Sequence, residues 1–291
     1  MHLLIQAIIL GVLTGGLYAL MTSGLTLTFG TMRIINMAQG VFVVVGAYIA
    51  FTFFNYLHVD PFLSMLVATP LMFALGVTLQ TFLLRPIRYD AHRLSLLMTW
   101  AMAIGLEGIL SLIYGTDFRG IITTYQNTSI TLFGYQFPLV RVLAFGLSVL
   151  VLVGMWLLLN RTKFGRAVRA VSQRESAAKL LGVNTDRTSA LAFGLGAATA
   201  GAAGAMFGLV TSFDPASHYD LIGRLLAICV LGGLGSNAGA ITGAVVLALS
   251  ESLVQAEFSP AWSSLPFYIL LVIVLIARPQ GLFGLRTRDA I

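Results

Sequence analysis

Residues 138 to 187 read PLVRVLAFGLSVLVLVGMWLLLN and then RTKFGRAVRAVSQRESAAKLLGVNTDR, so one passage contains both environments that the chain occupies. Its first part, 138–160, is apolar with a single internal arginine, and about 20 such residues suffice for an α-helix to cross the hydrocarbon core. Its second part, 161–187, carries seven lysines and arginines and is the only long polar passage of the sequence. We therefore expect a membrane-spanning helix that enters water at Arg161.

The whole composition agrees with this passage. The chain of 291 residues is 58% hydrophobic and only 10% charged, with a mean hydropathy of +0.92, whereas soluble domains are about 25% charged. Apolar runs of helix-spanning length recur, and they lack the alternation of barrel strands. The sequence predicts an all-α integral membrane protein: one polytopic bundle over residues 1–291 with about 8–10 spans. The expected spans are 4–24, 38–57, 62–84, 94–115, 138–160, 189–211, a glycine-broken region 221–256, and 264–278.

Basic residues near the span ends predict the orientation. The positive-inside rule places loops rich in lysine and arginine in the cytoplasm, and it accounts for the net charge of +6 without nucleic-acid binding. The loop 116–137 is then expected outside. The expected cytoplasmic clusters are Arg85, Arg88 and Arg93, the loop 161–188, and Arg278, Arg286 and Arg288.

The glycine-broken region contains LGGLGSNAG, residues 231–239. Its first apolar piece is too short to cross the bilayer at 1.5 Å per residue, so we expect a discontinuous helix. It forms either two short crossings, or one crossing and a re-entrant piece. Gly235, Gly239 and Gly243 have the small-x-x-x-small spacing of close helix packing, although a break at this depth also indicates a buried cavity.

Polar residues within the spans are the candidates for a translocation path. Glu107 lies in the middle of an apolar run, where a charge is costly. It either lines the path or is a protonated or hydrogen-bonded packing residue next to Gly105 and Gly108. Asn36 and Gln39 carry amides that could bind unwound backbone or a zwitterionic solute, or else cap a helix at the cytoplasmic edge. Glu251 and the four histidines, near span ends, are interpreted as interfacial.

The cytoplasmic loop contains a short helix with defined ends. Ser172 and Glu175 have the spacing of a capping box and Gly182 that of a C-cap, which predicts a helix over residues 173–181. Small side chains at Ala177 and Ala178 would let a partner approach its backbone. Lys163, Arg166 and Arg169, spaced three apart, would share one helix face. We interpret the loop as a docking surface rather than only a topology signal.

No catalytic or nucleotide-binding pattern is present in the sequence: we find no phosphate loop, no H-E-x-x-H and no nucleophile elbow. A single cysteine, Cys229, excludes a multi-cysteine metal site. We therefore expect a transporter subunit that is not an enzyme, holds no metal or cofactor and takes its energy from elsewhere. The alternatives are a channel or facilitator that works alone and, less favoured, an intramembrane enzyme.

Three stretches, 15–50, 161–184 and 226–246, together resemble the permease subunits of branched-chain amino acid ABC transporters, the LivH type. The chain has Gln39 where many relatives have histidine, and Val41 where many have glutamate. The resemblance implies a signature near the transport path at Asn36, Gln39 and Gly40. It also implies an ATPase-coupling region, which comprises Arg166, Arg169, Glu175, Ala177, Ala178 and Gly182.

The resemblance further implies the partners. They are a second homologous permease, two ATPase subunits that bind ATP and magnesium, and a binding protein that delivers solute from outside. The complex would lie, among membrane lipid, in a bacterial inner membrane. Leucine, isoleucine and valine are the implied solutes, and urea, short amides or other small solutes are the alternatives that the superfamily offers.

Overall fold

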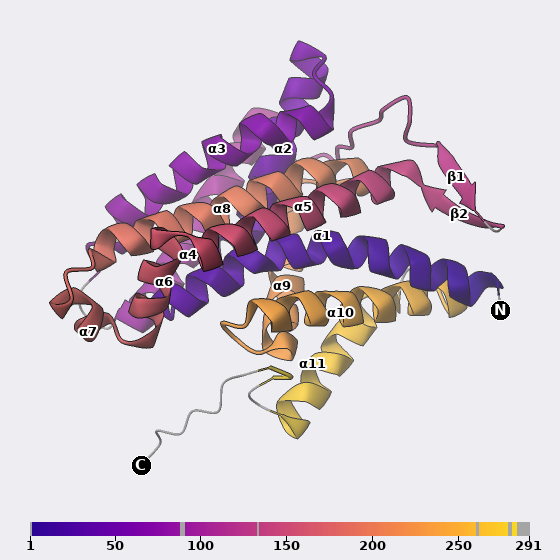
Figure 1. Cartoon of the computed structure of the whole chain (residues 1–291). Helices are drawn as coiled ribbons and strands as arrows, with labels where there is room; N and C mark the ends of the chain where they lie inside the picture. Colours follow the sequence, from indigo (N-terminus) through magenta and orange to yellow (C-terminus); the bar gives the residue numbers. More distant parts are fainter. Residues whose placement is uncertain (1, 88–90, 133, 260–261, 279–280, 284–291) are drawn as a thin grey trace.

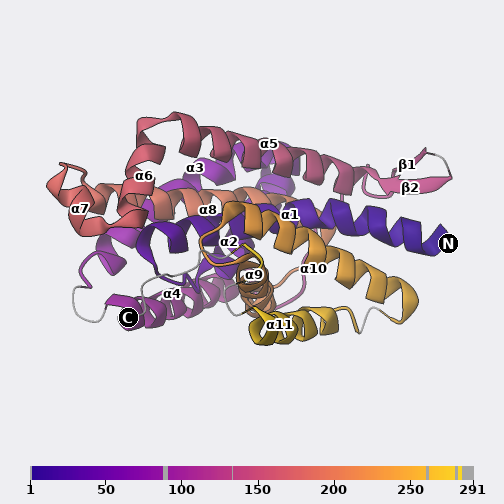
Figure 2. The ribbon, with the colours of Figure 1, turned by 60° about the horizontal axis from the view of Figure 1, so that its bottom comes forward.

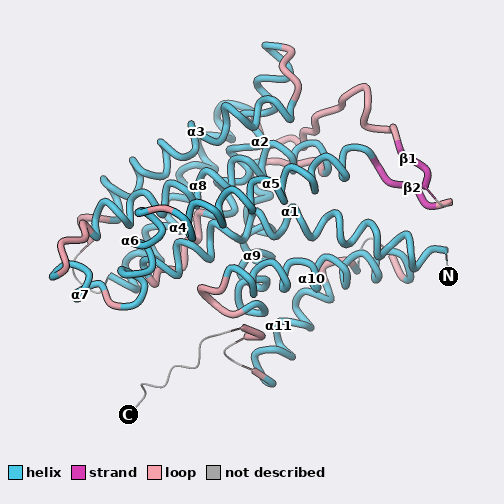
Figure 3. Tube along the Cα trace, viewed as in Figure 1, coloured by secondary structure: helices cyan, strands magenta, loops and turns pink. Residues whose placement is uncertain are grey.

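The computed structural model describes residues 2–87, 91–132, 134–259, 262–278 and 281–283. Helices make up nearly all of the described regular structure, apart from a two-stranded hairpin (Figure 3). The prediction of an all-α polytopic membrane protein is confirmed. The elements are α1 (His2–Met32), α2 (Gln39–Leu57), α3 (Pro61–Leu79), the π-helix η1 (Gln80–Leu84), α4 (Ala91–Tyr114), β1 (Ser129–Leu132), β2 (Tyr135–Pro138), α5 (Leu139–Arg161), α6 (Lys163–Gln173), α7 (Glu175–Leu180), α8 (Thr185–Val210), the 3₁₀-helix η2 (Pro215–Ser217), α9 (His218–Gly232), α10 (Asn237–Glu257) and α11 (Leu265–Ala277).

Seven helical segments within the described residues are long and apolar enough to cross a membrane. They are α1, α2, α3 with η1, α4, α5, α8 and α10, and the shorter α9 and α11 accompany them. Local chemistry explains several of the helix starts. Asp60 caps α3 by accepting a hydrogen bond from the Phe62 N–H, with Pro61 at the first helical position. Asn184 caps α8 by accepting from the Arg187 N–H.

The described parts of the three basic clusters lie at one end of the bundle. Arg85 pairs with Asp186 at 2.9 Å, which joins the first cluster to the loop 161–188. After Arg278, the chain returns to the α9–α10 turn, where the Leu282 N–H donates to the Leu231 carbonyl. Arg88, Arg286 and Arg288 lie outside the described residues. The N-terminus and the β1–β2 hairpin lie together at the opposite end (Figure 1), as the positive-inside interpretation requires.

Helix α8 is the centre of the bundle, and glycine lets its neighbours approach closely. Most of its apolar window, 89%, is buried inside the chain. A Cβ at Gly204 would overlap the Val43 carbonyl of α2, and one at Gly201 would lie 2.5 Å from the Met72 side chain of α3. Backbone contact at this range maximises dispersion between helices, which is the main packing energy available inside a membrane.

Helices α2 and α9 both begin inside the bundle rather than at its ends. The Gln39 side chain, at the start of α2, donates to the Met21 carbonyl of α1, and Met21 lies about 16 Å from the end of α1 at 1.5 Å per residue. A Cβ at Gly40 would lie 2.6 Å from the His218 carbonyl at the start of α9. The starts of these two helices therefore meet within the protein interior, where their backbone can be satisfied by protein.

The glycine-broken region forms two antiparallel helices, α9 and α10, joined by a tight turn. Gly233 and Gly235 occupy positive φ, at 97° and 84°, as the turn requires. Gly239 packs directly on Gly232, and a Cβ at Gly243 would lie 2.8 Å from the Ile228 carbonyl. The predicted role of Gly235 in helix packing is wrong, because it lies in the turn before α10 begins. Of these two helices, α10 is a candidate span, whereas α9 has 15 residues and begins inside the bundle, as expected for a piece too short to cross the bilayer. The choice between two short crossings and a re-entrant piece stays a prediction.

The last three helices form a group that packs on α1. Glycines in α1 again permit the contact: a Cβ at Gly11 would lie 2.9 Å from Leu249 Cα, and one at Gly15 would lie 3.0 Å from Val245 Cα. Viewed from below, α9, α10 and α11 lie on the side of α1 away from α3 (Figure 2).

Candidate functional site

The predicted coupling helix is a pair of helices, α6 and α7, at the end of the bundle (Figure 1). Arg174 separates them in extended backbone, with φ −157° and ψ 103°. The predicted capping box is wrong, because Ser172 lies in the last turn of α6 and donates to the Arg169 carbonyl, while Glu175 begins α7. A capping box needs both residues at the start of one helix.

The end of α7 is fixed by Gly182. Its φ of +80° lets its N–H reach the Lys179 carbonyl at 3.1 Å, while the Val183 N–H reaches the Ala178 carbonyl at 3.0 Å. This pair of hydrogen bonds is a Schellman motif. The predicted C-cap at Gly182 is therefore confirmed, and α7 is held between two defined ends.

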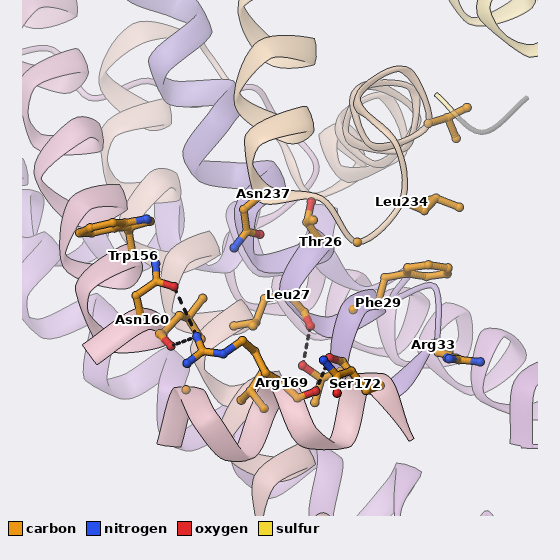
Figure 4. Close-up of a pocket in the computed structure, with 18 residues that line it drawn as sticks. Thr26, Leu27, Phe29, Arg33, Trp156, Asn160, Arg169, Ser172, Leu234 and Asn237 are labelled. Atoms are coloured by element: carbon orange, nitrogen blue, oxygen red, sulfur yellow. Dashed lines mark hydrogen bonds between the residues drawn. The ribbon is translucent and has the colours of Figure 1, made fainter. Parts of the chain in front are cut away.

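The two arginines predicted for the docking face of α6 behave differently. Arg169 donates to the Leu159 carbonyl at 2.6 Å and to Asn160 Oδ1 at 3.3 Å, so its guanidinium ties α6 to the end of α5 (Figure 4). Arg166 is exposed, and it makes no side-chain bond to any part of the chain that the structure describes. Arg166 can therefore meet a partner, whereas the guanidinium of Arg169 is bonded within the chain.

The small residues of α7 lie closer to the chain than expected. Ala178 is buried, so it cannot form the open contact surface that the sequence predicted, and Ala177 is half-buried. Glu175 and Lys179 form an exposed ion pair with Oε1 and Nζ 2.7 Å apart. The hydrogen bond that Lys179 donates to this carboxylate raises the pKa of Lys179, and the pair stabilises one turn of α7.

Two leucines, rather than the alanines, project at the end of α7: Leu180 is its last residue and Leu181 its C-cap. Leu180 is 89% exposed and Leu181 is 82% exposed, in a part of the chain that belongs to no candidate span. Neither leucine was singled out in the sequence, although two adjacent leucines inside a polar loop were an indication of such a surface. A projecting apolar pair held by a capped helix is typical of a docking surface.

A pocket of about 740 Å³ opens beside α6, between the end of α1, α5 and the α9–α10 turn. Its lining is mixed: Trp156 and Leu234 are apolar, while Asn160, Arg169 and Asn237 are polar (Figure 4). Gly235 also lines it, so the glycine break does border a cavity, although this cavity opens at the end of the bundle and is not the buried one that the sequence indicated. A second pocket of about 660 Å³ is lined by residues that include Arg33, Arg174 and Lys179. Movement of α6–α7 would change the shape of both pockets.

The predicted path residues Asn36, Gln39 and Gly40 are fully buried where α2 begins. Asn36 Oδ1 accepts from the Ala38 N–H at 3.1 Å, and Gln39 Nε2 donates to the carbonyls of Met21 at 3.0 Å and Gly196 at 3.3 Å. Asn36 therefore satisfies the unwound backbone just before α2, one of the roles considered, whereas Gln39 bonds carbonyls within the helices α1 and α8. Capping at the cytoplasmic edge is wrong, because the site lies well inside the bundle.

Glu107 is held by two residues of α9. Its Oε2 accepts from the Tyr219 hydroxyl at 2.8 Å and lies 3.0 Å from His218 Nε2. His218 is completely buried, so its interpretation as an interfacial histidine is wrong. A Cβ on Gly105 or Gly108 would meet no atom within 4 Å, so the hydrogen bonds to α9, rather than close packing at these glycines, hold Glu107.

A second polar cluster joins α9 and α10 to α1. Arg224 pairs with Glu251 at 2.8 Å and with Asp220 at 2.9 Å, and it donates to the Tyr18 hydroxyl at 2.8 Å. Glu251 is 7% exposed, so its predicted interfacial position is wrong. Arg224 was not singled out in the sequence, because only the fold brings Glu251 and Tyr18 to it.

Comparisons with known proteins agree on one family. The family described as "Branched-chain amino acid transport system / permease component" matches residues 7–275 of the chain. A relative from Methanocaldococcus jannaschii, named "Probable branched-chain amino acid transport permease protein LivH", is 30% identical over 94% of this chain and 90% of its own. A relative from Pseudomonas aeruginosa, the "High-affinity branched-chain amino acid transport system permease protein BraD", is 28% identical over 96% of this chain and 95% of its own.

A different type of permease is also similar. The "High-affinity branched-chain amino acid transport system permease protein LivM" of Escherichia coli is 30% identical over 91% of this chain and 67% of its own. No solved structure matches the chain.

Proposed function

The chain belongs to the branched-chain amino acid transport permease family, and from this membership we propose that it is one membrane subunit of an ATP-driven importer. The solutes proposed are leucine, isoleucine and valine, carried inward across a bacterial inner membrane. The names of the relatives in three organisms support this choice of solute.

The observation that carries the proposal is the leucine pair of α7. Burying an exposed leucine in an apolar cleft is worth roughly 1.5–3 kcal/mol, so Leu180 and Leu181 offer a partner a compact and strong contact. They lie at the same end as the described basic clusters, which is the cytoplasmic side by the positive-inside rule. ATPase subunits are the partners proposed for this surface, and ATP with magnesium would be bound there and not by this chain.

The remaining partners follow from the family. A second permease of the same or a related sequence would complete the path, since this chain resembles both the LivH and the LivM types. A solute-binding protein would deliver amino acid at the end that carries the β1–β2 hairpin. Membrane lipid would cover the apolar faces of helices such as α5.

A mechanical link connects the proposed ATPase surface to the spans. The α6–α7 pair is tied to α5 by Arg169 and to α8 through the short Gly182 turn. Displacement of α7 would therefore pull directly on two membrane-spanning helices. Because packed helices resist continuous deformation, such a pull would favour a switch between two arrangements of the bundle.

The test is the double variant Leu180→Asp/Leu181→Asp. We expect at least a tenfold loss of ATPase subunits that co-purify with the chain, together with loss of ATP-driven leucine uptake into proteoliposomes. Each substitution replaces buried apolar contact with an unpaired carboxylate at the interface. Both positions lie in water in the free chain, so membrane insertion should be unaffected.

Leu132→Asp is the matched control, since Leu132 is an exposed leucine on β1 at the opposite end of the molecule. It should leave co-purification of the ATPases unchanged. Normal ATPase binding and coupling by the double variant would refute the proposal. So would leucine flux through the chain alone, without ATP or partners, which is the behaviour of a facilitator.

A further inference from the structure

Glu107 differs from the two carboxylates of the polar cluster around Arg224. Asp220 and Glu251 share the guanidinium of Arg224, at 2.9 and 2.8 Å. Glu107 forms no ion pair with a lysine or arginine among the described residues; its partners are His218 and Tyr219. One intramembrane carboxylate therefore lacks a cationic side chain beside it.

The carboxylate is held in place, and one of its oxygens is left open. Both bonds from α9 go to Oε2, from the Tyr219 hydroxyl and from His218 Nε2. Nδ1 of His218 is buried and finds no partner in the described structure, so Nε2 is assigned as the protonated nitrogen. Throughout the described residues no donor is bonded to Oε1 of Glu107, whose side chain is 21% exposed.

Space adjoins this carboxylate on both helices. Gly105 and Gly108 flank it on α4, and Gly223 lies one turn beyond Tyr219 on α9. A Cβ at any of these three glycines would meet nothing within 4 Å. The indole of Trp100 stands 5.7 Å from the Tyr219 ring, so an aromatic surface borders the space. These three positions therefore leave open space through which a small molecule can approach the carboxylate.

Depth and neighbours connect the site to the transport path. Glu107 lies seven residues before the end of α4 at Tyr114, about 10 Å inside the apolar span Arg93–Tyr114. His218, which holds it, also carries the carbonyl that closely approaches Gly40. The predicted path residues of α2 and Glu107 are thus joined through one histidine, in the half of the bundle that faces the β1–β2 hairpin.

We propose that Glu107 Oε1 binds the primary ammonium group of the transported amino acid. A carboxylate accepts strongly from an ammonium, and the solute would supply the positive charge that the chain does not provide. Tyr219 and His218 are positioning residues that hold the carboxylate, and Trp100 would border the apolar side chain of the solute. This inference rests on the proposed import of amino acids.

The experiment uses the complete complex in proteoliposomes: both permeases, the ATPase subunits and the binding protein. In Glu107→Gln, we expect leucine uptake to fall about 10- to 100-fold, the value of one charge-assisted hydrogen bond. Assembly of the complex should be retained, because glutamine can still accept from Tyr219 and His218. Glu257→Gln, a neutralised and exposed carboxylate at the end of α10, is the matched control and should transport normally.

A second readout distinguishes ligand contact from a structural role. A diazirine analogue of leucine, photolysed in the wild-type complex, should label peptides of α4 or α9. Excess leucine should prevent the labelling, whereas its analogue without the amine, 4-methylpentanoate, should not. Glu107→Gln should lose the label, and Tyr219→Phe, which keeps the charge, should retain it with a several-fold weaker affinity.

The failure of this inference differs from failure of the proposed function. If ATPase subunits bind and the wild-type complex imports leucine, yet Glu107→Gln transports and labels normally, the ammonium site is refuted and the importer stands. If the wild-type complex imports only solutes that lack an amine, the site is likewise refuted. If the ATPases never bind, the proposed function fails, while amine-dependent labelling of the chain itself would still uphold the site.

Discussion

Gly204→Ala is expected to lower the free energy of unfolding by about 3 kcal/mol or more, the upper end of the cost of overpacking a core. The added methyl would overlap the Val43 carbonyl and lie 2.9 Å from the Ala47 nitrogen and 3.0 Å from Gly46 Cα. These are backbone atoms of α2, so no side-chain rotation can relieve the overlap, and α2 would have to move away from α8. Thermal unfolding of the purified protein in detergent, followed by size-exclusion chromatography, measures the loss.

Gly154→Ala on α5 is the matched control. A Cβ there meets no atom within 4 Å, and alanine is the better helix former by up to about 1 kcal/mol. This variant should melt at or slightly above the wild-type temperature. If Gly204→Ala melted together with Gly154→Ala, close packing of α2 on α8 would be contradicted.

Arg224→Met is expected to destabilise the protein by about 3–5 kcal/mol, because it leaves the buried carboxylate of Glu251 without its cation. Glu251 would retain only the hydroxyl of Tyr18, at 3.1 Å. Adding Glu251→Gln to Arg224→Met should recover part of this loss, since no charge then remains buried. The coupling measured in this double-mutant cycle should be about 0.5–3 kcal/mol.

Arg85→Met serves as the comparison for that cycle. Its ion pair with Asp186 is exposed: the side chain of Arg85 is 55% exposed and that of Asp186 is 50% exposed. Exposed ion pairs contribute about 0–1 kcal/mol to stability. Equal losses for Arg224→Met and Arg85→Met, measured by thermal unfolding in the same detergent, would contradict the buried cluster. Additive effects of Arg224→Met and Glu251→Gln would contradict it as well.

Some features of the cytoplasmic end were predictable because they depend on neighbours in sequence. The C-cap at Gly182 follows from a helix that must stop and a residue that tolerates positive φ. The start of α7 was not predictable in this way. Ser172 and Glu175 have the spacing of a capping box, but α6 continues through Ser172 because its apolar face packs on the bundle through Val168 and Val171. Tertiary packing outweighed the local motif.

The partners of the polar residues within the spans, by contrast, could not be predicted from the sequence. Glu107 attracted attention as an isolated charge, but its alternatives stayed open because His218 and Tyr219 are more than 100 residues away. Glu251 and His218 were misjudged as interfacial for the same reason. Distance from the end of an apolar run measures depth along one helix, and it carries no information about which helix lies opposite.

The sequence by itself determined that this chain is a helical membrane protein, which basic clusters share one end, and which family it belongs to. Run length, charge and composition suffice for these, since a bilayer imposes the same requirement on every span. Only the tertiary structure decided that Arg224 neutralises Glu251, that Glu107 has one open oxygen, and that Leu180 and Leu181 project while Ala178 is buried. Each of these depends on atoms from different helices, and helix rotation and packing determine those neighbours.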